Sequence, residues 1–139
     1  MKPAQSQYHD IKIGAIYEFK RTITHADVCA FADLTGDHNP LHVDQKFGAQ
    51  SQFGKNVVHG MLAGSLFSTL VGMYCPGTSA LYVSQTLQFK KPVFYGDTIT
   101  VCGTVIDKYD SIKMVVLKTE VLRDGEVMVS GEARAKVLE

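Results

Sequence analysis

The stretch VVHGMLAGSLFSTLVGMYC, from Val57 to Cys75, decides how this chain must fold. It lies within a longer segment, Asn56 to Phe89, that contains no Asp, Glu, Lys or Arg. A membrane-spanning helix needs about 20 predominantly apolar residues, whereas this stretch carries a histidine, three glycines and several hydroxyl side chains before Pro76-Gly77 ends it. We therefore expect no membrane span, but a helix over Gly60–Tyr74 that is apolar on all sides and buried within protein.

The residues that follow this helix have the pattern of strands. Apolar and polar side chains alternate from Val127 to Val137, which indicates a strand with one buried face. Asp124-Gly125, just before it, is a strong two-residue hairpin signal. Ile99, Val101 and Val105 share one face of an earlier segment. The strands expected before the hairpin are Leu81–Lys90, Thr98–Ile106 and Ile112–Leu122.

The residues before the central helix predict a strand over Ile16–Ile23 and a helix over His25–Leu34. Thr24 is the expected N-cap, with Asp27 in the capping-box position, and Gly36 is the expected stop. A short helical turn is expected near Asp44–Gln50. The side chains expected to face inward from the first helix are Val28, Phe31, Ala32 and Leu34.

Helices that come early and strands that come late indicate the α+β class, with an antiparallel sheet packed against helix. The length of 139 residues predicts one domain, 1–139. One long apolar helix with several long strands suggests a sheet curled around that helix. The far side of the helix and the sheet edge then need cover, which a homodimer would supply.

Charge and cysteine content argue against several classes of protein and indicate a cellular compartment. Lys+Arg and Asp+Glu both number 14, and this zero balance argues against a dedicated nucleic-acid-binding protein. Cys29, Cys75 and Cys102 have neither paired disulfide spacing nor zinc-ligand spacing. With no apolar signal segment at the N-terminus, these features predict a cytoplasmic protein.

The densest polar cluster is GDHNPLH, Gly36 to His42. Asn39-Pro40 is a turn pair that can bring Asp37 and His42 side by side, and an Asp–His pair can hold a water and move protons. The alternative is a surface loop in which Asp37 caps a turn. Spacing alone leaves both interpretations open.

His59-Gly60 is expected to begin the buried helix, where a glycine N–H is open to a ligand oxygen. His59 itself fits a structural histidine better than a catalyst. Ser65 and Ser68 on the helix fit close packing, and neither lies in a G-x-S-x-G elbow. Lys90-Lys91 could meet a phosphate, although lysines at a strand end are usually only solvated.

FADLTGDHNPLHVD, VVHGMLAGSLFSTLVG and LQFKKPVFYGDTITV, in this order, resemble the MaoC-like (R)-specific enoyl-CoA hydratases and (R)-3-hydroxyacyl dehydratases. The resemblance covers the chain from about Ile16 to the C-terminus. It implies a hot dog fold, in which an antiparallel sheet wraps a long central helix and two subunits join their sheets. It also implies reversible hydration of a trans-2-enoyl thioester to an (R)-3-hydroxyacyl thioester.

The same resemblance assigns roles residue by residue. Asp37 and His42 match the pair that holds the water, and Gly60 matches the glycine whose N–H meets the thioester oxygen. Asn39 matches a supporting asparagine, and Ser68 a helix position near the acyl chain or the catalytic groups. No metal or redox cofactor is implied, and coenzyme A or acyl carrier protein is the handle of the substrate. Other candidates for the acyl tunnel are Leu62, Ser65, Leu66 and Tyr82.

Three alternatives remain open. The first is a 3-hydroxyacyl-acyl carrier protein dehydratase, with the same residues and a different handle. The second is an acyl-CoA thioesterase, against which stands the absence of a carboxylate from the central helix. The third is a non-catalytic acyl-CoA-binding module, which intact Asp37, His42 and Gly60 argue against.

Overall fold

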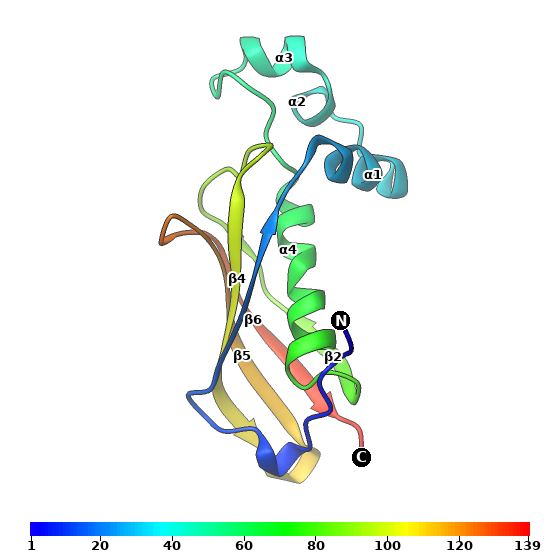
Figure 1. The fold of residues 1–139 in the computed structure, drawn as a ribbon, viewed down its shortest axis with the longest axis vertical. Helices are drawn as coiled ribbons and strands as arrows, with labels where there is room; N and C mark the ends of the chain where they lie inside the picture. Colours follow the sequence, from blue (N-terminus) through cyan, green and yellow to red (C-terminus); the bar gives the residue numbers. More distant parts are fainter.

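A computed structural model describes all residues, 1–139, and shows a six-stranded sheet packed against one long helix (Figure 1). Every strand pairing is antiparallel. The strand order is β1-β4-β5-β6-β2, with β3 paired to β6, so β1 and β2 form the two edges. The strands are β1 (Ile16–Thr22), β2 (Ala80–Gln85), β3 (Gln88–Phe89), β4 (Thr98–Tyr109), β5 (Met114–Arg123) and β6 (Glu126–Val137). The predicted hot dog architecture is confirmed, although the sheet does not close around the helix.

The central helix α4 spans Gly60–Thr69 and continues as a π-helical turn, η2 (Leu70–Tyr74). Its sheet-facing side, which includes Ala63, Leu66 and Phe67, is buried. The expectation of burial on all sides is wrong for this chain, because the open sheet covers only one face. On the other face Met61 is 56% exposed, and Ser65 and Ser68 are exposed as well. None of the helices combines the length and the apolar character that a membrane span requires.

Three short helices, α1 (His25–Thr35), α2 (Pro40–Val43) and α3 (Gln45–Gln50), lie together beyond one end of the sheet (Figure 1). The predicted capping box is present: Thr24 Oγ1 accepts from Asp27 N, and the Asp27 carboxylate accepts from Thr24 N. Gly36 ends α1 in the left-handed conformation, with φ 81°. Two 3-10 turns, η1 (Tyr8–Asp10) and η3 (Asp110–Ile112), complete the elements.

Two sequence expectations fail in these elements. Leu34, expected to face inward, is 85% exposed, because it lies about 200° around the α1 axis from the buried Ala32. The sequence did not predict the helix α2. Its start is stabilised by Pro40 at the first position and by the Asn39 side chain, which accepts a hydrogen bond from Leu41 N.

The single strand expected over Leu81–Lys90 is two strands, β2 and β3. The break follows from Gly131 on β6. A Cβ atom at Gly131 would lie 1.8 Å from Thr86 O, so only a glycine lets the chain approach this closely. The hairpin before β6 is as predicted, with φ 50° at Asp124 and 78° at Gly125, the positive angles of a tight primed turn.

Candidate active site

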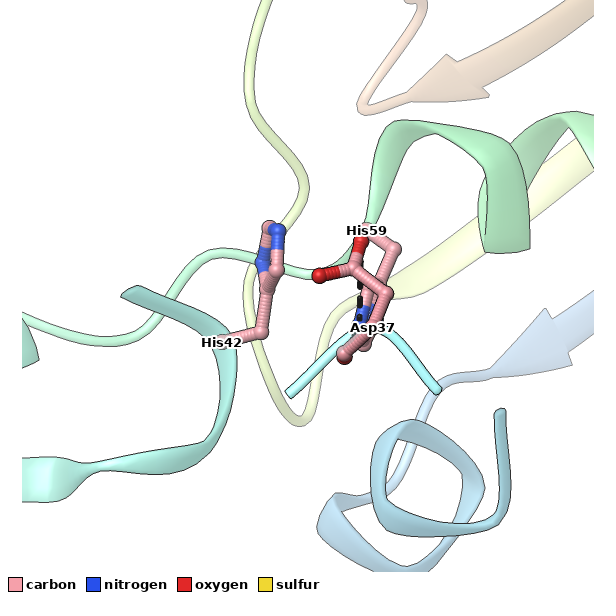
Figure 2. A group of neighbouring side chains, drawn as sticks. All are labelled: Asp37, His42 and His59. Atoms are coloured by element: carbon pink, nitrogen blue, oxygen red, sulfur yellow. Dashed lines mark hydrogen bonds and ion pairs between the residues drawn. The ribbon is translucent and has the colours of Figure 1, made fainter. Parts of the chain in front are cut away.

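Three segments meet at the end of α4 that faces α1 and α2. The left-handed Gly36 turns the chain out of α1 and presents Asp37. Asn39 caps α2, on which His42 lies. His59 is the N-cap of α4, and Gly60 is its first residue. The side chains of Asp37, His42 and His59 thus gather in one place (Figure 2), with one polar atom of each within 4.8 Å of the others. The predicted proximity of Asp37 and His42 is confirmed.

His42 is fixed by its hydrogen bond to the backbone. Its Nδ1 lies 2.6 Å from Val57 O. A carbonyl oxygen only accepts, so Nδ1 carries the hydrogen and the neutral ring has its lone pair on Nε2. Nε2 has no hydrogen-bond partner in the protein, and it is therefore available to accept a proton from a bound water.

Asp37 presents a half-exposed carboxylate, 51% accessible, that points toward the His42 ring (Figure 2). Its Oδ1 accepts from Asn39 N at 3.2 Å, which fixes the turn after α1. Oδ2 lies 3.9 Å from His59 Nε2. An acceptor carboxylate beside an imidazole that can accept or donate is an arrangement able to bind one water and move its protons.

The three side chains are the one group whose donors lie close enough to suggest a metal ion. The two imidazoles, however, stack with ring centroids 4.0 Å apart and planes 28° from parallel. Lone pairs lie in the ring planes, so stacked rings do not direct both nitrogens at one ion, as tetrahedral zinc sites require. The geometry fits proton transfer better than metal binding.

A cavity of about 420 Å³ opens at this group. Asp37, His42 and Gly60 line it together with apolar side chains, among them Phe53, Met61 and Phe89. A few polar groups in an apolar cavity are typical of a small-molecule site.

The start of α4 supplies donors to this cavity. The backbone N–H groups of Gly60 and Met61 precede the first intrahelical hydrogen bond and donate to no protein atom. A Cβ atom at Gly60 would lie 2.9 Å from Cδ1 of Phe89, so a side chain there would displace the Phe89 ring. Gly60 lines the cavity and its N–H has no protein partner, which are the requirements for a donor to a ligand oxygen.

Comparison with known proteins agrees with this geometry. Residues 10–126 match the family described as MaoC like domain. The chain belongs to the MaoC-like family. The (R)-specific enoyl-CoA hydratase of Aeromonas caviae is 38% identical over 91% of this chain and 96% of that protein. The mitochondrial 3-hydroxyacyl-[acyl-carrier-protein] dehydratase of Solanum lycopersicum is 39% identical over 90% and 76%. The unliganded R-hydratase PhaJ1 of Pseudomonas aeruginosa matches with TM-score 0.90, at 34% identity over 95% of this chain and 85% of that one.

Four residues proposed from the sequence for substrate binding lie outside the cavity of this MaoC-like chain. Asn39 caps α2. Leu62 faces a separate cavity of about 240 Å³ between β1, α1 and α4. Ser65 donates from Oγ to Leu62 O at 2.6 Å, and Ser68 is exposed on the same open face of α4. Their part in substrate binding stays a prediction.

Sequence reasoning missed several residues that line the cavity of this family member. Phe53 and Phe89 carried no motif signal, and Phe89 reaches Gly60 from β3, on the other side of α4 in the sequence. Lys90 and Lys91 are exposed, as expected for lysines at a strand end, and both also line the cavity. Lys91 forms an ion pair with Glu126, and Lys90 has no carboxylate partner.

Proposed function

We propose that this protein catalyses the reversible, stereospecific hydration of trans-2-enoyl-CoA to (R)-3-hydroxyacyl-CoA. Its family and its relatives named hydratase or dehydratase make it a hydro-lyase. The observation that supports the specific reaction is one cavity lined by Asp37, His42 and Gly60, a glycine whose N–H has no protein partner.

In the proposed mechanism, Asp37 and His42 hold one water above Cβ of the enoyl group. The water oxygen forms a bond to Cβ as one of its protons passes to the pair, and a proton from the pair is delivered to Cα. The hydroxyl group on Cβ and the proton on Cα thus come from the same side, which predicts syn addition. Proton transfer of this kind contributes roughly 10²–10⁴-fold.

Negative charge develops on the thioester oxygen between these two bond-forming events. The Gly60 N–H, at the positive end of the α4 dipole, would donate to that oxygen. One such donor contributes about 3–4 kcal/mol. Addition of water changes no net oxidation state, so we propose that no redox cofactor takes part. The stacked rings of His42 and His59 do not direct two nitrogens at one ion, and we propose that no metal takes part either.

The proposal includes a homodimer. The open face of α4 exposes Met61, and the edge strand β2 exposes Leu81 and Val83, each half accessible. An edge strand with exposed apolar side chains is normally covered. A second copy that pairs along β2 would extend the sheet and cover this face of the helix.

Dehydration of an (R)-3-hydroxyacyl-acyl carrier protein is a second candidate. The tomato dehydratase, as close in sequence as the hydratases, favours it. The chemistry and the residues are the same, and only the carrier of the thioester differs. Comparison of kcat/KM on matched CoA and carrier-protein thioesters distinguishes the two.

The test is a hydration assay on crotonyl-CoA, with chiral analysis of the product. We expect (R)-3-hydroxybutyryl-CoA from the wild type. Asp37→Asn and His42→Gln should each lower kcat by at least about 10²-fold, because each removes a proton-transfer group. Asp33→Asn, on the exposed side of α1, is the matched control and should keep full activity.

Three outcomes would contradict the proposal. Turnover close to wild type in Asp37→Asn or His42→Gln would show that the substituted residue is not a proton-transfer group. Release of free thiol from the CoA thioester would indicate a thioesterase. Binding of the thioester with no turnover on either carrier would indicate a non-catalytic module.

A further inference from the structure

His59 is a buried polar residue that the proposed mechanism does not use. It is 2% exposed, lies beside Gly60 and lines the same cavity as Asp37 and His42. We infer that His59 is a positioning residue that holds the Asp37 backbone and the His42 ring at the spacing needed to bind one water between them. This inference rests on the proposed hydratase function and adds a residue to it.

The first contact is to Asp37. His59 Nε2–H donates to the Asp37 carbonyl at 3.0 Å, across 22 residues of sequence (Figure 2). The other hydrogen bonds of Asp37 remain inside its own turn: Asp37 N donates to Thr35 Oγ1, and Asp37 Oδ1 accepts from Asn39 N. His59 therefore makes the single hydrogen bond that ties Asp37 to the rest of the molecule.

The second contact is to His42. The two rings stack at 4.0 Å, while Phe31 packs against His59 with ring centroids 4.8 Å apart. His42 is held in its ring plane by the bond from Nδ1 to Val57 O, and His59 covers one face of that ring. One side chain thus contacts both members of the proposed pair, and it begins the helix that carries Gly60.

The chemistry of the site argues that His59 does more than fill space. The Asp37 carbonyl only accepts, so the hydrogen of the neutral ring lies on Nε2. The remaining nitrogen, Nδ1, is buried without a partner. An unpartnered buried nitrogen is unfavourable, and an apolar residue of similar size would fill the position without that cost.

Three substitutions separate the two contacts. His59→Gln keeps an N–H donor for Asp37 and loses the ring. His59→Phe keeps a flat face for His42 and loses the donor. His59→Leu loses both. A buried polar residue in the sheet, Thr119, gives the control substitution Thr119→Val.

We expect His59→Leu to lower kcat by about 10- to 100-fold with KM changed less than about threefold, because small misplacement of reacting groups has effects of this size. His59→Gln should recover part of the lost kcat. The melting temperature of His59→Leu should not fall, since the unpartnered nitrogen is gone. Thr119→Val should lower stability and leave kcat unchanged.

Amide hydrogen exchange supplies a readout that needs no turnover. In His59→Leu, exchange at the turn 36–39 should accelerate by about tenfold or more, while exchange in β4 to β6 stays the same. The inference is overturned if kcat stays within about threefold of wild type in His59→Leu. It is also overturned if His59→Gln is no better than His59→Leu, or if exchange at the turn is unchanged.

Failure of this inference and failure of the proposed function give different results. If Asp37→Asn loses turnover and His59→Leu does not, only the positioning role is wrong. If wild type hydrates neither thioester, the proposed function is wrong, and hydrogen exchange at the turn still decides whether His59 holds Asp37 in place.

Discussion

Gly60→Ala is the sharpest test of the oxyanion site, because it adds one methyl group at the unpaired N–H. Gly60 lies in the first turn of α4 with an ordinary helical backbone, so alanine can adopt its conformation. The new Cβ would lie 2.9 Å from Phe89 Cδ1 and 3.0 Å from Cε1. Phe89 is 52% exposed, and its ring can move aside.

The two effects of this methyl group differ in size. On stability, alanine gains up to about 1 kcal/mol of helix propensity over glycine, which offsets the displacement of the Phe89 ring. On activity, the methyl group and the displaced ring occupy the space through which a thioester oxygen must reach the Gly60 N–H. Loss of one such donor costs about 2.7–4 kcal/mol, or 10²–10³-fold in kcat.

The assay is hydration of crotonyl-CoA at saturating substrate, with thermal unfolding measured on the same samples. Gly64→Ala, one turn further along α4, is the matched control: its Cβ meets Leu87 Cδ2 at 3.1 Å, and Gly64 does not line the cavity of Asp37. We expect Gly60→Ala to lose activity at unchanged melting temperature and Gly64→Ala to retain it. A Gly60→Ala protein within about threefold of wild-type kcat would refute the reasoning.

Two further predictions concern a helix cap and the cavity rim. The backbone N–H of Thr24 holds the pKa of Asp27 below its ordinary value of 3.8, so the cap contributes stability above that pH and loses it as the pH falls below. Asp27→Ala should lower the free energy of unfolding, measured in urea at neutral pH, by about 1 kcal/mol, and the control Asp33→Ala should not lower it. If Asp27→Ala remained less stable than wild type by the same amount at acid pH, the prediction would be contradicted. Lys90→Glu should raise KM for an acyl-CoA about fivefold at constant kcat, because coenzyme A carries negatively charged phosphates. Lys91→Glu should raise KM less, since Lys91 already pairs with Glu126. Equal KM values in wild type and Lys90→Glu would exclude a role for the Lys90 charge in binding.

Local signals in the sequence were reliable where the structure is set by near neighbours. The Thr24–Asp27 capping box, the stop at Gly36 and the Asp124-Gly125 turn all depend on residues within a few positions of each other. The meeting of Asp37 and His42 was predictable for the same reason, since one turn joins them.

Features set by distant parts of the chain were not predictable. The break between β2 and β3 depends on Gly131, which is 45 positions beyond Thr86. The residues around Leu87 contain no local pattern that predicts this break. The contact of His59 with the Asp37 carbonyl spans 22 residues, so the sequence identified a structural histidine but not what it holds. The exposed face of α4 could not be read from an all-round apolar pattern, because apolar residues pack equally well against a sheet or a second subunit.

The short strand β3 determines where substitutions near the cavity are best tolerated. It is joined to β6 by only two residue pairs, Gln88↔Ser130 and Phe89↔Val129, and the residues 86–87 separate it from β2. Phe89 and the two lysines beyond it thus form a rim that is attached to β6. The N–H groups of Lys90 and Lys91 donate to Met128 O, and Lys91 forms an ion pair with Glu126. Under the proposed hydratase function, substitutions of these exposed side chains should widen or narrow the range of acyl groups accepted, at little cost in stability. For directed evolution, β3 is therefore the place to diversify first.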